Sequence, residues 1–151
     1  MPEQRQLYDY WQEKAGANVM PGRSDISPAQ IPRLLPNVSL LEREMPTDRF
    51  KIRLAGTCLR EVFQREVTGS YVDHPDLASA ENYWTAVCAQ VLESASPAQG
   101  VVKAPNRAND HLVQFWLRLP LGADHINVDM ILGLDMFVPA VEMAELQTIC
   151  A

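Results

Sequence analysis

Arg49-Phe50-Lys51-Ile52-Arg53-Leu54-Ala55 is the stretch of sequence that decides the fold. Its apolar and basic side chains alternate strictly, which is typical of a strand with one buried and one solvated face. The segment before it, residues 37–44, also has the composition of a strand, and Met45-Pro46-Thr47-Asp48 has the composition of a turn. Residues 37–55 are therefore predicted to form a β-hairpin.

Helical patterns lie before and after this hairpin. Leu7 and Trp11 stand four residues apart on one face of an N-terminal segment that ends at Gly16. A longer segment places Trp84 and Val91 on one apolar stripe. The predicted helices cover residues 3–15, one or two turns after Ser27-Pro28, a short helix opened by Gly56 with Thr57 as its cap, residues 78–93, and Val141–Cys150.

Three further strands are predicted in the second half of the chain: Gly100–Pro105, Leu112–Leu119 and residues 126–138. The turn at Pro120–Asp124 makes the last two an antiparallel hairpin. Two hairpins that flank a helical middle imply an α+β fold, in which a five-stranded antiparallel sheet carries helices over one face and a further helix at the N-terminus.

Composition limits the kinds of partner. The chain has 151 residues, which fits a single domain, and its net charge is −6. Residues 1–65 hold ten basic and eight acidic side chains, and the remainder holds three and eleven. An acidic total argues against nucleic-acid binding.

No apolar run is long enough to cross a membrane, and three widely spaced cysteines fit reduced thiols, so a cytoplasmic protein is expected.

Several motifs of the first half occur together. They are Leu7 with Tyr10 and Trp11, Met20-Pro21-Gly22-Arg23-Ser24-Asp25-Ile26-Ser27-Pro28, Ile31-Pro32-Arg33-Leu34-Leu35-Pro36, the segment from Phe50 to Gly56-Thr57, and Thr68-Gly69. This combination resembles a subfamily of largely stand-alone, single-domain bacterial PAS proteins. The second half is similar only in its order of strands. The subfamily usually has arginine after Thr-Gly, whereas this chain has Ser70.

The resemblance implies a PAS core over residues 37–138, preceded by a helical and proline-rich segment 1–36 and followed by a tail 139–151. It also implies a sensory or regulatory module that signals through another chain. Such a module would bind a small ligand or a signalling partner protein and would not be an enzyme.

Haem-binding relatives usually have a histidine on the long helix, and flavin photosensors carry Asn-Cys-Arg-Phe-Leu-Gln. Since residues 78–93 lack histidine and Cys58 stands in Gly-Thr-Cys-Leu-Arg, neither cofactor is predicted.

The large side chains expected between the sheet and its helices have two interpretations. They are candidate ligand-pocket residues, namely Phe63, Tyr71, Trp84, Phe115 and Met130. The same side chains would equally make a packed core, because pockets and cores use the same residue types. An unidentified small molecule is the ligand in the first interpretation.

No metal site is predicted. All three histidines follow an aspartate, which favours polar turns. His111 and His125 lie beyond opposite ends of one predicted strand, which would hold them about 25 Å apart.

The N-terminal helix carries Leu7, Tyr8 and Trp11, which are too apolar to remain in water. They are expected to cover the outer face of the sheet or to pair two protomers, and a homodimer is predicted.

Two other classes of function stay open: a small enzyme that uses the inner cavity, and an interaction adaptor with a filled core. An enzyme requires an ionisable group in the cavity. The positions expected to point inward are all non-ionisable, namely Leu54, Phe115, Leu117, Met130 and Leu132.

Overall fold

The computed structural model describes residues 1–78, 80–105 and 111–142. Its centre is one five-stranded antiparallel sheet, as predicted, with the strand order β2-β1-β5-β4-β3. The strands are β1 (Val38–Glu44), β2 (Arg49–Ala55), β3 (Ala98–Lys103), β4 (Leu112–Leu121) and β5 (Met130–Pro139). Both predicted hairpins are confirmed, because β1 pairs with β2 and β4 pairs with β5.

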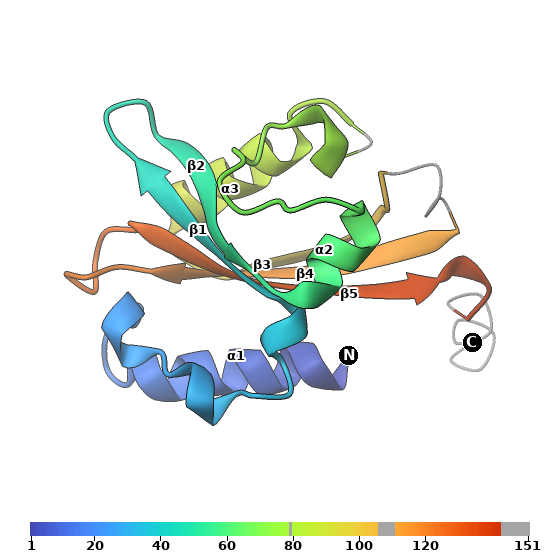
Figure 1. Ribbon diagram of the computed structural model, residues 1–151. Helices are drawn as coiled ribbons and strands as arrows, with labels where there is room; N and C mark the ends of the chain where they lie inside the picture. Colours follow the sequence, from blue (N-terminus) through green and yellow to red (C-terminus); the bar gives the residue numbers. More distant parts are fainter. Residues whose placement is uncertain (79, 106–110, 143–151) are drawn as a thin grey trace.

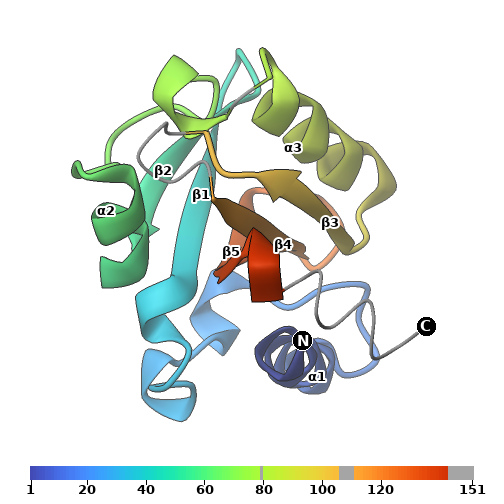
Figure 2. The same cartoon turned by 90° about the vertical axis from the view of Figure 1, so that its right-hand side faces the viewer.

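Helices cover both faces of this sheet. Helix α1 (Pro2–Ala15) lies along one face, while α2 (Thr57–Phe63) and α3 (Tyr83–Ser94) lie over the other (Figures 1 and 2). Single 3-10 turns also lie at Arg23–Asp25, Pro28–Gln30, Leu35–Asn37 and Pro75–Leu77. None of the helices within the described ranges has both the length and the apolar character that a membrane span needs.

The face under α1 is the more apolar face of the sheet. Trp11 donates its indole N–H to the backbone carbonyl of Pro120 at 2.8 Å, and Leu7 is fully buried. Leu117 lies beside Tyr8 of α1, and alternation along β4 places Leu119 on the same side. Burial of these large apolar side chains is the main force that holds α1 on the sheet.

The prediction of which residues point toward α2 and α3 was wrong. Leu117 and Leu132 are instead buried on the opposite face of the sheet, the face that carries α1, and Phe115 and Met130 belong to the same outward-facing rows of β4 and β5. The helical middle was expected to cover the apolar face of the sheet. The amphipathic helix α1 covers that face, which leaves a more polar face for α2 and α3.

Leu54 also does not point inward, because the pairing of β1 with β2 shifts near it. Leu40 pairs with Leu54 and Leu41 pairs with Ile52, so Arg53 is an extra residue on β2. An extra residue of this kind reverses the alternation of faces. Phe50 and Ile52 are buried as the pattern predicts, whereas Leu54 is 53% exposed.

Several predicted helix boundaries were wrong. Helix α3 begins at Tyr83 rather than at residue 78, because Asn82 adopts a left-handed conformation with φ of 60°. The segment after Ser27 makes a single 3-10 turn. The cap of α2 is Gly56 and not Thr57. Most of the predicted helix Val141–Cys150 lies outside the described residues.

The close packing around Gly56 explains why a glycine stands in the motif that runs from Phe50 to Gly56-Thr57. A Cβ atom at this position would lie 2.2 Å from the backbone oxygen of Leu35 and 2.3 Å from that of Pro36. Only glycine permits this close approach of two backbone segments.

Candidate functional site

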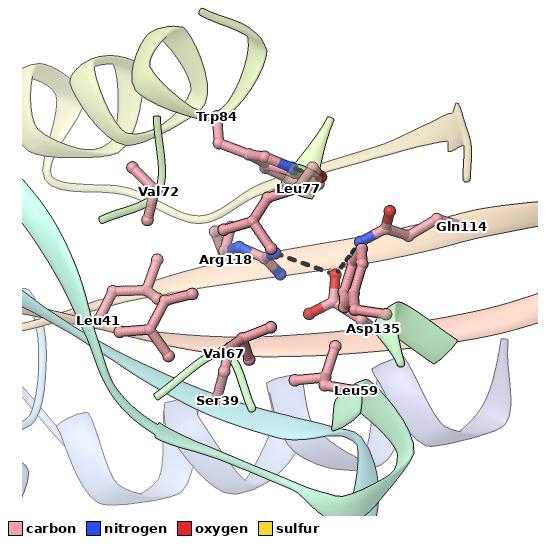
Figure 3. A pocket seen from close by; sticks show the side chains of 12 residues that line it. Ser39, Leu41, Leu59, Val67, Val72, Leu77, Trp84, Gln114, Arg118 and Asp135 are labelled. Carbon is pink, nitrogen blue, oxygen red and sulfur yellow. Dashed lines mark hydrogen bonds and ion pairs between the residues drawn. The ribbon is translucent and has the colours of Figure 1, made fainter. Parts of the chain in front are cut away.

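A cavity lies between the inner face of the sheet and the segments that carry α2 and α3 (Figure 3). Eight apolar side chains line it, among them Phe63, Leu77 and Trp84. Four polar side chains of the sheet complete its wall: Ser39, Gln114, Arg118 and Asp135. The space open to the centres of water molecules is about 40 Å³. A cavity of this size, with four polar side chains in its wall, has room for water or for a small molecule.

The polar wall is organised around the carboxylate of Asp135. Arg118 Nη2 lies 2.9 Å from Asp135 Oδ1, and Gln114 Nε2 donates to the same oxygen at 2.8 Å (Figure 3). Arg118 Nη1 donates to the backbone carbonyl of Leu117 at 2.9 Å. The side chains of Arg118 and Asp135 are only 6% and 2% exposed. The attraction within a buried ion pair offsets the cost of removing both charges from water most fully when hydrogen bonds also satisfy its remaining atoms.

Some polar atoms of this wall remain without a partner among the described residues. Arg118 Nε and Gln114 Oε1 are buried and make no hydrogen bond with any residue that the structure describes. Asp135 accepts both of its side-chain hydrogen bonds at Oδ1, and its other oxygen points away from the two donors (Figure 3). Buried polar atoms without a partner are costly, so each requires an explanation.

Aromatic rings close the cavity on the side of α3. The Arg118 guanidinium carbon lies 4.7 Å from the centroid of a Trp84 ring, within the range of a cation–π contact. Trp84 donates its indole N–H to the carbonyl of Leu77 at 2.7 Å, and Trp116 donates to the hydroxyl of Tyr83 at 2.9 Å. These bonds fix the two indoles, so the charged group lies against a rigid surface.

The five predicted pocket residues do not come together. Phe63 and Trp84 line the cavity. Tyr71 instead lies beside β2, where its hydroxyl contacts Glu44 at 2.9 Å and its ring packs 3.6 Å from the Arg49 guanidinium carbon. Phe115 and Met130 belong to the outer face of the sheet.

Sequence reasoning missed Gln114, Arg118 and Asp135, although a signal was present. Gln114 and Arg118 are four residues apart on one strand and therefore share a face. Asp135 pairs with Trp116, midway between them on the neighbouring strand. Gln114 and Arg118 are the two polar residues of the otherwise apolar strand β4. Their spacing could have identified the polar face of this strand.

The predicted interface residues lie mostly inside the chain. Leu7 and Trp11 are buried beneath the sheet, and only Tyr8 keeps partial exposure. Of the two expectations for α1, covering the outer face of the sheet is therefore the one the structure realises. Leu7 and Trp11 are not available to a second copy of the chain.

Two of the three histidines make local structural contacts with their side chains. His74 Nδ1 accepts from the backbone N–H of Asp76 and so caps the 3-10 turn at Pro75–Leu77. A ring nitrogen of His125 lies 3.0 Å from the backbone oxygen of Met20. Within the part of the chain that the structure describes, no group of three metal-ligating side chains is found.

The solved structures most like this chain include light–oxygen–voltage domains. One such domain, studied with a flavin analogue, superposes with a TM-score of 0.60 at 14% identity, over 80% of this chain and 90% of that one. The Aureochrome1 LOV domain gives 0.57 at 9% identity, over 78% and 91%. The Rhodobacter sphaeroides LOV protein gives 0.51 at 13%, over 75% and 69%. At these identities the likeness shows the fold alone. No curated protein matches the chain.

The cavity is too small for a flavin. A tricyclic flavin ring is far larger than a space of about 40 Å³, and no cysteine is among the cavity-lining residues.

Burial raises the pKa of the Cys88 thiol to about 12, and burial also raises the pKa of Cys58. Both thiols are therefore held in the protonated, less reactive form.

A family model described as "PAS domain" matches residues 1–136. The match includes α1 and the whole of the predicted proline-rich segment as well as the sheet. The fold agrees with this match, because a five-stranded antiparallel sheet with helices over its inner face is also the fold shared with the solved structures above. The chain belongs to the PAS domain family.

Proposed function

We propose that this chain is a sensory module that binds a small molecule in the cavity between the sheet and helices α2 and α3. The occupied and empty forms would differ in their contacts with a regulatory protein, which carries the output. The observation that carries the proposal is the polar wall formed by Gln114, Arg118 and Asp135, which has unpartnered buried atoms beside an internal space.

An adaptor with a filled core explains this wall less well. A core with no ligand gains nothing from a buried ion pair, because apolar residues of similar volume are often as stable or more so. A binding site does gain from such a pair, since fixed polar groups orient a ligand. The arrangement around Asp135 therefore favours binding over simple packing.

The enzyme alternative required an ionisable group in the cavity, and Asp135 meets that requirement. A general base must accept a proton, which would neutralise this carboxylate. The guanidinium of Arg118, 2.9 Å away, would then be a buried charge without a counter-ion. The ion pair thus opposes acid–base chemistry at Asp135 and supports a binding role.

The proposal is tested by adding the small-molecule fraction of a bacterial extract to the purified protein and measuring its thermal unfolding. A ligand that binds only the folded state raises the midpoint. The variant Val67→Leu adds a methylene group at the cavity wall and should lose this shift. Val128→Leu adds the same group at a buried site outside the cavity wall, and this control should keep the shift. An extract that shifts none of the three proteins would contradict the proposal.

In the same proposal the protein acts in the bacterial cytoplasm as a homodimer. Since α1 uses Leu7 and Trp11 to cover its own sheet, the second copy must use another surface. Light scattering at high protein concentration tests the oligomeric state, and a monomer mass would contradict this part.

A further inference from the structure

We infer that the cavity accepts a neutral molecule of about four non-hydrogen atoms that carries both a hydrogen-bond donor and an acceptor, as a small amide does. This inference rests on the proposed function and names the class of ligand. It follows from three properties of the cavity: its volume, the balance of its charges and the hydrogen bonds left open in its wall.

The volume limits the size of the molecule. A cavity holds one water when a water-sized sphere can fill about 10–15 Å³ of it. The cavity offers about 40 Å³ to the centres of such spheres, so it has room for several groups of that size. Nucleotides, haem and flavins are excluded by this volume, whereas an amide of four non-hydrogen atoms fits.

The charges limit the ligand to a neutral molecule. Arg118 and Asp135 are the two charged side chains of the wall, and they neutralise each other at 2.9 Å. An anion would have to compete with Asp135 for the guanidinium, and a cation would compete with Arg118 for the carboxylate. Either would leave a third buried charge without a counter-ion, which is strongly unfavourable.

The open hydrogen bonds set the functional groups. Arg118 Nε is a donor without an acceptor in the described part of the chain, which calls for a carbonyl or hydroxyl oxygen on the ligand. Gln114 Oε1 is an unpartnered acceptor, and the second oxygen of Asp135 accepts no hydrogen bond from the described residues, so both call for an N–H or O–H group. A primary amide offers both kinds of group within four non-hydrogen atoms.

The test compares three molecules of the same size: acetamide, which donates and accepts; acetone, which only accepts; and acetate, which is charged. Each is titrated into the ¹⁵N-labelled full chain while the Nε–H resonance of Arg118 and the indole N–H of Trp84 are followed. For a ligand this small we expect acetamide to bind with a dissociation constant on the order of 1 mM. Acetone and acetate should each bind at least about ten-fold more weakly, because each leaves a buried polar or charged group unpaired.

Two variants locate the binding site. Gln114→Met removes the unpartnered acceptor and should weaken acetamide binding by about five-fold or more, while Gln99→Met, at an exposed position of β3, should leave it unchanged. The comparison of the three molecules on the wild-type protein does not depend on either variant.

Three results would overturn the inference. Acetone could match acetamide, acetate could bind best, or no molecule could perturb the Arg118 resonance at concentrations far above 1 mM. The last result would mean that water alone fills the cavity or that it takes a different class of ligand. If an extract still stabilised the wild type but not Val67→Leu, the sensory proposal would stand and only the amide class would fail.

Discussion

Arg118 on β4 and Asp135 on β5 form an ion pair across the inner face of the sheet, with Nη2 and Oδ1 2.9 Å apart. The residue directly opposite Arg118 on β5 is Gly133, and a Cβ atom there would lie 3.0 Å from Arg118 Nη1. The glycine therefore gives the guanidinium room to lie flat across the sheet. The pair, the glycine and the amide of Gln114 form one structural unit.

Removal of one partner of this pair should be costly. Arg118→Met leaves the Asp135 carboxylate buried without a counter-ion, and we expect a loss of about 3–5 kcal/mol of unfolding free energy. Adding Asp135→Leu to Arg118→Met should restore most of that loss, because the uncompensated charge is then gone. Urea denaturation of the two single variants and the double variant measures the coupling.

The exposed pair Arg53–Glu42 is the control for this cycle. Its atoms lie 3.3 Å apart, with both side chains about half exposed, so Arg53→Met should cost no more than about 1 kcal/mol. If Arg118→Met and Arg53→Met lowered the unfolding free energy equally, the Arg118–Asp135 pair would be solvated rather than buried.

Gly133→Ala should disturb the cavity without removing any polar group. The added Cβ would lie 2.5 Å from Ser39 Oγ and would press on the guanidinium of Arg118. Overpacking of this kind costs about 1–3 kcal/mol. The Arg118 Nε–H resonance should shift at the same time. If neither this resonance nor the unfolding free energy changed, the close approach of residue 133 to Ser39 and Arg118 would be refuted.

The covering of the sheet by α1 predicts a strong effect at Leu7. Leu7→Ala removes a fully buried side chain and should lower the unfolding free energy by about 2–5 kcal/mol. Gln6→Ala, one residue earlier on the exposed side of α1, should stay within about 0.5 kcal/mol of wild type. Denaturant unfolding compares the two, and a neutral Leu7→Ala would show that α1 does not contribute to the core.

Thiol reactivity should distinguish the two described cysteines. With the pKa of Cys88 raised to about 12 by burial, only about one molecule in ten thousand carries its thiolate at pH 8. Cys58 is half-buried and should react first with iodoacetamide. Peptide mass spectrometry of the native protein measures both rates. Labelling of Cys88 should rise tenfold per unit of pH well below 12, and a rate equal to that of Cys58 would contradict its burial.

The sequence predicted the sheet well because its strands follow local rules. The alternation of Phe50 and Ile52 and the turn at Met45–Asp48 define the first hairpin without reference to other parts of the chain. The stripe of Trp84, Val87, Cys88 and Val91 on α3 is buried as the helical spacing indicated. The motifs of residues 7–57 indicate the family because each is a short, contiguous pattern that can be recognised from the sequence alone.

The candidate site could not be predicted in the same way, because it depends on which helix covers which face. Leu117 and Leu119 made one face of β4 look like the inner one, but α1 packs against it from the far N-terminus of the sequence. That contact joins residues more than one hundred positions apart, so periodicity cannot reveal it. Once the face was misassigned, Arg118 and Asp135 were not recognised as cavity residues.

The most direct test of ligand binding in the cavity is a crystal structure of the full chain, grown with acetamide, at a resolution that shows individual water molecules. We expect the Arg118–Asp135 pair intact beneath Trp84 and a bound molecule within hydrogen-bond reach of Gln114 Oε1 or Arg118 Nε. A cavity lined by Phe115 and Leu117, or one in which these polar atoms meet other protein groups and no molecule is bound, would contradict this expectation.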